Sequence, residues 1–284
     1  MNGILIVDKP AGWTSHDVVA KLRGAAHEKR MGHSGTLDPM ATGVLAVFAG
    51  RATRAVEFAE ADEKEYIASL RLGLRTDTLD TTGTVLESCD TPVSQTALEA
   101  VLPRFRGEIE QLPPMYSAIK INGQKLCDLA RKGREVERMP RRVTISALEL
   151  TGRDGEDYVL RVVCSKGTYI RTLCDDIGAA LGVGGCMSAL RRTRAGAFGI
   201  GMAHPLETLL PHPENYLLPV DSLFAAYPAL TAPVPAEKAV RNGGGFSVSA
   251  GDGTYRVYAE NGGFLLLGRV ENGTARTIKS FFEV

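Results

Sequence analysis

The sequence predicts a mixed α/β (α+β) fold, with a large domain built on a mixed, largely antiparallel sheet and a small all-β domain after it. Three observations favour this class. The chain has 284 residues, which is longer than one ordinary domain. Over about the first 210 residues, strand-like segments outnumber helical ones and many look hairpin-linked. A proline-dotted connection then leads into a Gly-rich tail of about 50 residues with short alternating strands. We place the domains at 1–230 and 231–284.

The first elements follow from apolar spacing and capping residues. Residues 3–7, GILIV, form a short apolar run typical of a buried strand. The segment from Ser15 to Arg30 has helical spacing, with Thr14 or Ser15 as the N-cap. The stretch EYIASLRLGL alternates as a strand does, with Tyr66 on the apolar face.

The remaining elements are predicted in the same way. Helices are expected over 94–106, opened by Ser94, and over 168–182, ended by Gly182. Strands are expected at 84–88, 143–150, 158–164, 246–250, 254–260, 263–270 and 275–281.

Composition limits the classes of function. Lys plus Arg number 33 and Asp plus Glu number 33, so no net charge attracts nucleic acid or anionic lipid, and any such attraction must be local. The five cysteines contain no C-x-x-C pair, which argues against a zinc site and a disulfide framework and favours the reducing cytosol. The apolar runs are too short for a signal peptide or a membrane span. We therefore expect a cytoplasmic protein.

One carboxylate stands in an unusual segment, Gly32–Leu45, GHSGTLDPMATGVL. Asp38 followed by Pro39 is the pattern of a helix N-cap and first helical position, and this structural interpretation is the commoner one. The alternative is a functional carboxylate on a loop whose glycines let the backbone approach a ligand closely. From the residues alone both interpretations stay open.

Three more side chains have a structural and a functional interpretation. Arg171 lies four residues before Asp175, the spacing of an ordinary helix-surface ion pair, but an arginine can also keep a distant carboxylate ionised. Tyr66 fits a half-buried sheet position or a stacking platform. His33 has no partner at metal-ligand spacing, so a polar loop role is expected.

Residues 114–142 combine Pro-Pro, Asn-Gly and a basic run. Between Arg131 and Arg142 there are six Arg or Lys and two Glu, preceded by Tyr116, Lys120 and Lys125. Such a run is usually a solvated surface, but basic and aromatic residues on a protruding loop also suit binding to RNA.

Taken in order, these segments resemble one family. The motifs KPAGWTSHDVV, GHSGTLDPMATGVL, KEYIASLRLG, RTDTLDTTG, QLPPMYSAIKINGQ, ARKGREV, CSKGTYIRTLCDDIG and LRRTRAGAF are similar to those of the TruB family of bacterial tRNA pseudouridine-55 synthases. They occur in family order over about residues 3–200. The resemblance implies a catalytic domain of pseudouridine-synthase type and a PUA-like RNA-binding domain at the C-terminus. It favours the functional interpretation of Asp38.

What the resemblance implies is assigned to matching positions only. The implied catalytic residues are Asp38, Tyr66 and Arg171, which fall on the aspartate, the stacking tyrosine and the arginine of the family. The implied substrate-binding residues are His33, Tyr169, Leu190, Asp80, Lys9 and Lys120, and residues 114–142 align with an arm that closes over the T-loop of tRNA. Two departures are Cys127, where the family often has an aromatic residue, and GVGGCMSA, which lacks an expected pair before Leu190.

The implied reaction is the isomerisation of uridine 55 in the T-loop of tRNA, with the base flipped out of the loop. It requires no metal, ATP or organic cofactor. The implied partner is tRNA, with no membrane and no obligate protein partner, since long basic extensions are missing. Two alternatives are a catalytically silent tRNA-binding module and a glycoside hydrolase using Asp38 and Asp80 as paired carboxylates.

Overall fold

The computed structural model describes residues 1–61, 63–121 and 123–282. The chain divides into two compact units. The first contains Met1–Asp38, Leu45–Glu60 and Gly201–Val284, and the second contains Pro39–Val44 and Ala61–Ile200. The chain thus passes from the first unit to the second at the peptide bond between Asp38 and Pro39. This division does not follow the boundary near residue 230, which stays a prediction.

The N-terminal part of the first unit packs one helix on short strands. Strand β1 (Gly3–Lys9) is buried, as predicted, and pairs in parallel with β14 (His204–Pro205). Helix α1 (Ser15–Ala26) follows, with Thr14 as its N-cap. Thr14 and Asp17 form a reciprocal capping box, which satisfies two of the backbone N–H groups that a helix start leaves open.

The segment Gly32–Leu45, whose sequence suggests a loop followed by a helix start, instead contributes to two strands. Strand β2 (Met31–Ser34) pairs antiparallel with β3 (Thr42–Ala49), and β3 is almost wholly buried. The apolar core of this region joins β1, α1 and β3 to the short helix α6 (Leu206–Leu209). The unit also contains α2 (Val56–Ala61) and the 3₁₀ helices η1 (Gly50–Ala55), η4 (Pro213–Tyr216) and η5 (Val220–Phe224). The 3₁₀ helix η3 (Ile200–Met202) begins at the last residue of the second unit.

The second unit is built on a mixed sheet. Its strand order is β12 (Gly185–Ala195), β4 (Lys64–Leu72), β11 (Asp157–Cys164), β10 (Arg141–Asp154) and β7 (Gly107–Gln111), all antiparallel neighbours. On its other side β12 pairs in parallel with Thr42 and Gly43, and its C-terminal end pairs with β13 (Phe198–Gly199). The predicted alternation of β4 is confirmed, since Lys64, Tyr66, Ala68 and Leu70 are buried. Strand β12 was not expected from its sequence.

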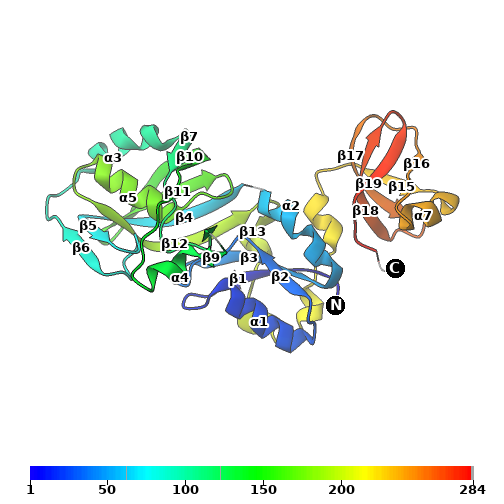
Figure 1. Cartoon of the computed structure of the whole chain (residues 1–284), viewed down its shortest axis with the longest axis horizontal. Helices are drawn as coiled ribbons and strands as arrows, with labels where there is room; N and C mark the ends of the chain where they lie inside the picture. The colour runs from blue at the N-terminus through cyan, green and yellow to red at the C-terminus, as the bar shows by residue number, and fades with distance from the viewer. Residues whose placement is uncertain (62, 122, 283–284) are drawn as a thin grey trace. The chain divides into compact units, whose positions relative to one another are not determined.

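Helices α3 and α5 and the hairpin of β5 and β6 also belong to the second unit (Figure 1). Helix α3 (Gln95–Val101) begins after the predicted cap Ser94 and continues as the 3₁₀ helix η2 (Leu102–Phe105). Helix α5 (Ile170–Ala180) contacts β12 and β4 and is followed by Gly182 at φ +74°. The hairpin of β5 (Leu74–Thr76) and β6 (Val85–Ser88) encloses the turn-rich segment around Asp80.

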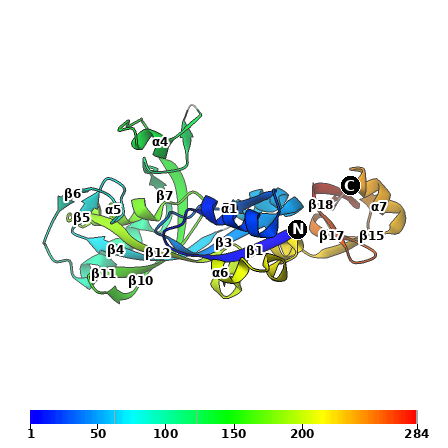
Figure 2. The same ribbon diagram turned by 90° about the horizontal axis from the view of Figure 1, so that it is seen from below.

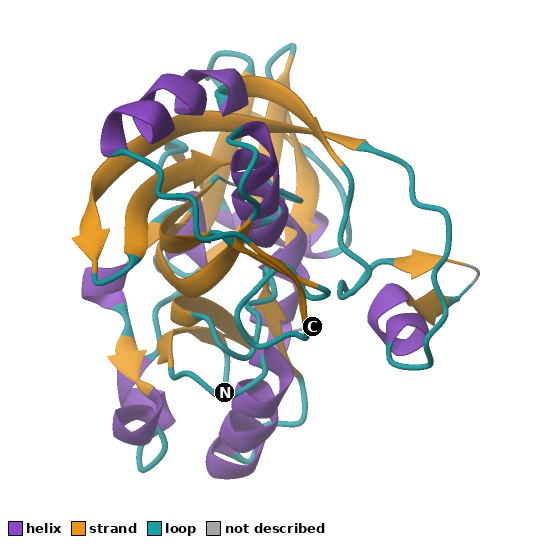
Figure 3. Cartoon of the chain, turned by 90° about the vertical axis from the view of Figure 1, so that its left-hand side faces the viewer, coloured by secondary structure: helices purple, strands orange, loops and turns teal. Residues whose placement is uncertain are grey.

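Residues 114–142, which we call the arm, project from the sheet of the second unit (Figures 2 and 3). The arm contains the paired strands β8 (Lys120–Ile121) and β9 (Gln124–Lys125) and helix α4 (Leu126–Ala130). Leu126 and Leu129 are buried, whereas Arg131, Lys132 and Arg134 are exposed. The basic run therefore lies on a small element that has apolar anchors of its own.

The last residues of the first unit form a five-stranded sheet. Its order is β15 (Ala229–Ala232), β17 (Gly253–Ala259), β18 (Phe264–Glu271), β19 (Thr274–Ser280) and β16 (Phe246–Ser247), shown in orange and red in Figure 1. The predicted small β domain is confirmed. Helix α7 (Val234–Arg241) and β15 were not predicted, because they fall in the proline-rich connection. The sheet and α7 share a separate apolar core.

Candidate active site

Asp38 lies on the loop between β2 and β3. Pro39 and Met40 form a turn, and the chain enters strand β3 at Thr42, so the described chain starts no helix at Asp38. The interpretation of Asp38 as a helix N-cap is therefore wrong, because the apolar run after it belongs to a buried strand. The segment positions the carboxylate between two strands that are fixed by their ladders.

Arg171 is a buried charge on the first turn of α5, with 5 % of its side chain exposed. Its Nη1 donates to the backbone oxygen of Thr78 at 3.0 Å, and its Nη2 donates to that of Tyr116 at 2.8 Å. Its Nε lies 3.9 Å from the Asp80 carboxylate. The guanidinium therefore connects the turn before β6 with the base of the arm.

The carboxylate of Asp80 is itself held by its own turn. Its Oδ1 accepts hydrogen bonds from the Thr78 hydroxyl at 2.8 Å and from the Thr82 hydroxyl and backbone N–H at 2.6 and 3.0 Å. Its Oδ2 faces Arg171. A buried carboxylate with these donors and a guanidinium partner is well compensated for its loss of water.

The helical partner suggested for Arg171 has a different contact. Asp175 Oδ1 lies 3.3 Å from Arg75 Nε, and Arg75 also contacts Glu87 at 2.8 Å. The spacing of four residues between Arg171 and Asp175 therefore does not predict this ion pair of Asp175. Its partner Arg75 lies on β5, about 100 residues earlier along the chain.

Tyr66 and Leu190 share one face of the sheet. Tyr66 lies opposite Arg192, and Ala68 lies opposite Leu190, in the antiparallel pair of β4 and β12. Directly opposite residues of such a pair point to the same face, and residues two apart along a strand do so as well. Tyr66 and Leu190 are therefore diagonal neighbours. Both are almost fully buried.

Tyr169 is the residue before α5. Its backbone N–H donates to Gln111 Oε1 at 3.0 Å, and Gln111 Nε2 donates to its backbone oxygen at 3.3 Å. This two-point contact ties the start of α5 to the end of β7. Tyr169 and Arg171 are thus placed by the same helix start.

The other three candidates lie on separate elements. Lys9 is fully buried at the end of β1, and its Nζ donates to the backbone oxygens of Pro10 at 2.8 Å and Trp13 at 2.6 Å. Its ammonium therefore shapes the turn before α1. His33 lies on β2 opposite Val47. Lys120 is exposed on β8 of the arm.

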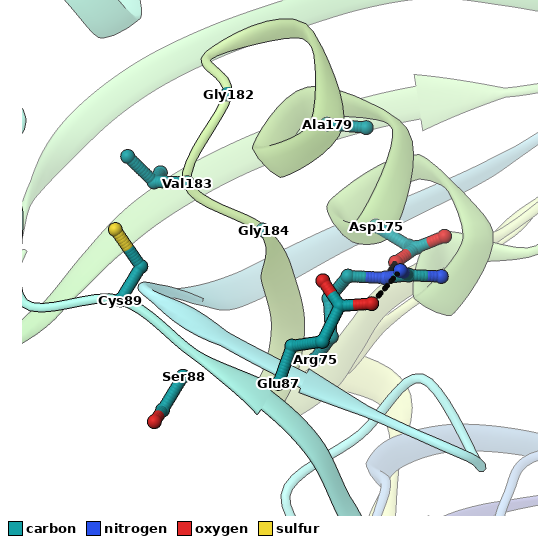
Figure 4. Close-up of a pocket in the computed structure, with 9 residues that line it drawn as sticks. All are labelled: Arg75, Glu87, Ser88, Cys89, Asp175, Ala179, Gly182, Val183 and Gly184. Atoms are coloured by element: carbon teal, nitrogen blue, oxygen red, sulfur yellow. Dashed lines mark hydrogen bonds and ion pairs between the residues drawn. The ribbon is translucent and has the colours of Figure 1, made fainter.

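A separate pocket of about 370 Å³ lies in the second unit and contains none of the predicted site residues. Figure 4 shows Arg75 beside the Glu87 and Asp175 carboxylates, with Cys89 across the pocket near Val183. Burial raises the pKa of Asp175, and a hydrogen bond with Thr91 lowers the pKa of Cys89. The sequence gives no signal for this pocket, because its walls come from β5, β6 and α5. Its arginine is already paired on both sides.

Among residues 1–61, 63–121 and 123–282, no three His, Cys, Asp or Glu side chains are grouped so as to hold a metal ion. Within the same part of the chain, no helix combines the length and apolar character needed to cross a bilayer.

Comparison with known proteins gives consistent matches along the chain. Residues 23–170 match the model of the TruB family pseudouridylate synthase N-terminal domain, and residues 171–225 match the tRNA pseudouridylate synthase B C-terminal domain. The chain is 44 % identical to tRNA pseudouridine synthase B of Azoarcus sp. (strain BH72), over 97 % of this chain and 93 % of the relative. It is 40 % identical to the protein of the same name from Clostridium kluyveri, over 99 % of this chain and all of the relative.

Solved structures show the same similarity of fold. One is a Cbf5-Nop10-Gar1 complex, with a TM-score of 0.75 and 28 % identity over 99 % of this chain and 85 % of that one. Another is an H/ACA RNP bound to a substrate RNA containing 2′-deoxyuridine, with a TM-score of 0.74 and 26 % identity over the same shares.

Proposed function

Because the chain belongs to the TruB family of pseudouridylate synthases, we propose that it isomerises uridine 55 in the T-loop of tRNA to pseudouridine. The observation that carries the proposal is the continuity of the family match, from residue 23 to residue 225, together with near-full-length relatives that bear this name. The segment that contains Asp38 lies inside this match.

The reaction breaks the C1′–N1 bond of the nucleoside, turns the uracil ring and joins C1′ to C5. The C5 hydrogen leaves as a proton and N1 gains one, so atoms and charge balance without an oxidant, a reductant or a second substrate. No side chain reaches C1′ in a stacked nucleotide, so the target base must first be taken out of the loop.

Asp38 is the proposed catalytic carboxylate. Its loop position suits this role, because a turn between two strands can present one side chain to a ribose. Tyr66 is proposed to stack on the uracil and to relay a proton through its hydroxyl. Arg171 is proposed to act on Asp38 through its positive charge.

The remaining residues are proposed to bind substrate. Tyr169 and Leu190 would line the pocket of the flipped nucleotide, Asp80 would orient Arg171, and His33 would pack in the reorganised T-loop. Lys9 would contribute to substrate binding at the turn that its ammonium holds, and Lys120 would contact phosphate with the rest of the arm. The purified chain is proposed to act alone on tRNA, without an obligate protein partner.

The decisive experiment uses tRNA with tritium at C5 of its uridines. Pseudouridine formation releases tritium to water, a glycoside hydrolase would release labelled uracil, and a silent binding module would release neither. We compare the wild type with Asp38→Asn and with Asp90→Asn, a control at an exposed loop carboxylate. Asp38→Asn should abolish release while tRNA affinity and melting temperature stay near wild type. Robust release by Asp38→Asn would remove this residue from the mechanism.

A further inference from the structure

The backbone of Leu37, the residue directly before Asp38, is held from both sides by one hydroxyl. Ser15 Oγ accepts a hydrogen bond from the Leu37 N–H at 2.8 Å and donates one to the Leu37 carbonyl at 3.2 Å. Both residues belong to the first unit. Ser15 is 1 % exposed and Leu37 is 3 % exposed, so the contact is shielded from water.

This hydroxyl is not needed by the helix on which it stands. Ser15 is the first residue of α1, and the capping interactions are made by its neighbours Thr14 and Asp17. The Thr14 hydroxyl accepts from the Asp17 N–H at 3.0 Å, and the Asp17 carboxylate accepts from the Thr14 N–H at 2.9 Å. The Ser15 side chain is therefore available for a contact outside the helix.

Leu37 needs such a partner. It lies between β2 and β3, in neither strand, and its buried N–H and C=O would each be costly without a hydrogen bond. Ser15 supplies a partner to each of the two groups. This contact fixes the peptide units on both sides of the Leu37 Cα, including the one that leads into Asp38.

The other side of the Asp38 loop is fixed by β12. Thr42 and Gly43 pair with Arg191 and Arg192, and Arg192 Nε donates to the Val44 carbonyl at 2.7 Å. Gly43 has φ +101°, and a Cβ there would lie 2.2 Å from the Arg192 backbone oxygen, so the close approach requires glycine. Besides the β2–β3 ladder, these two contacts hold the loop, and the contact of Ser15 is made at the residue next to Asp38.

We propose that Ser15 is a positioning residue for the Asp38 carboxylate, acting through the backbone of Leu37. This inference rests on the proposed function, in which Asp38 performs the chemistry. A misplacement of about 1 Å in a reacting group can slow a reaction about 100-fold. Ser15→Ala removes both hydrogen bonds and frees the N-terminal side of the loop. The single-turnover rate at saturating tRNA should fall about 10- to 100-fold, with the tRNA Kd within about twofold of wild type.

The matched control is Thr14→Ala. It removes the capping hydroxyl of the same helix, one residue away, but leaves the contact between Ser15 and Leu37 intact. It should lower the melting temperature through loss of the cap, while leaving the single-turnover rate near wild type. Ser15→Thr keeps the hydroxyl and should recover most of the rate. If Ser15→Ala does not fold, Ser15→Cys serves, because it keeps the volume and weakens both hydrogen bonds.

Hydrogen exchange supplies a readout that is independent of catalysis. In Ser15→Ala the amide of Leu37 should exchange faster, whereas in Thr14→Ala it should stay as protected as in the wild type. A wild-type rate for Ser15→Ala, or equal slowing of Ser15→Ala and Thr14→Ala, would overturn the positioning role. Full activity of Asp38→Asn would instead overturn the proposed catalytic role of Asp38 and the inference that rests on it. The two failures are therefore distinguishable.

Discussion

At the scale of single residues, Arg171 is a buried charge with a structural role and a proposed catalytic role. Its guanidinium is almost fully shielded from water and is compensated by two backbone oxygens and the Asp80 carboxylate. Removing it would leave Asp80 buried without its counter-charge. Arg171 thus has a structural contribution that is separate from its proposed effect on Asp38.

Substitutions of Arg171 separate these contributions. Arg171→Lys keeps the charge but loses the planar fork, so partial single-turnover activity is expected. Arg171→Met should slow the reaction by about 100-fold or more and reduce the free energy of unfolding by about 3–5 kcal/mol. Tritium release and denaturant unfolding measure the two effects. Arg161→Met is the control, since Arg161 forms more exposed ion pairs with Glu65 and Glu149. Equal activity of the Lys and Met variants would contradict the charge argument.

Asp176 gives a pH prediction. Burial and the neighbouring Asp175 raise the pKa of Asp176 from 3.8 to about 6. Because the folded-state pKa is the higher one, this carboxyl favours the folded state at low pH, and its contribution is lost as pH rises through about 6. Asp176→Asn should therefore raise the melting temperature at pH 7–8 by about 2–4 °C and have little effect below about pH 4. Melting curves across this range test it, and a constant difference at every pH would refute it.

At the scale of elements, the arm combines a fixed base with a charged outer segment. Tyr116 at its base accepts a hydrogen bond from Arg171, and Leu126 and Leu129 of α4 are buried. Among the described residues, the exposed Arg131 contacts Asp128 at 3.6 Å. An exposed pair of this kind contributes about 0–1 kcal/mol, so its guanidinium can turn to a phosphate at little cost.

Neutralising the arm tests its proposed contact with tRNA. The triple substitution of Arg131, Lys132 and Arg134 by Ala should weaken tRNA binding and reduce the slope of log Kd against log salt by about 2–3. The single-turnover rate at saturating tRNA should change little. The same substitution of Lys21, Lys29 and Arg104, which are exposed elsewhere, is the control. An unchanged slope would identify the basic run as an ordinary solvated surface.

At the scale of the whole molecule, an aromatic cluster links the C-terminal sheet to the rest of the first unit. The ring of Phe224 on η5 lies 5.4 Å from that of Phe58 on α2 and 5.6 Å from that of Phe281. Phe264 of β18 completes the cluster. Lys279 also pairs with Glu57 at 2.7 Å. The C-terminal sheet is therefore packed against α2 and η5, in addition to being connected to them by the polypeptide chain.

Disrupting this cluster should lower the free energy of unfolding but have little effect on the single-turnover rate. Phe224→Ala should reduce the free energy of unfolding by about 3–5 kcal/mol, because Phe224 is 2 % exposed. A chain that ends at residue 230 should melt earlier for the same reason. Both proteins should retain most of the single-turnover rate wherever they are folded. Tyr227→Ala, at a 42 % exposed site, is the control. A Phe224→Ala protein as stable as the control would contradict this packing role.

Much of this protein follows from local sequence. The capped helices after Thr14 and Ser94, the alternating strand with Tyr66 and the final β sheet are all predicted, because periodicity and capping act over a few residues. The order of the motifs along the chain indicates the family. The family in turn favours a functional role for Asp38. These features need no knowledge of distant contacts.

Other features were decided by tertiary structure alone. Strand β12 carries Arg191 and Arg192, which suggest a surface, yet Arg192 is buried and donates to the Val44 carbonyl. The ion pair of Asp80 and Arg171 and the contact of Ser15 with Leu37 join residues far apart in the chain. Even the short stretch after Asp38 forms a strand because β12 and β2 pair with it. Hydrogen bonds and buried charges are satisfied by whichever groups the fold brings close, and a one-dimensional pattern carries no record of those partners.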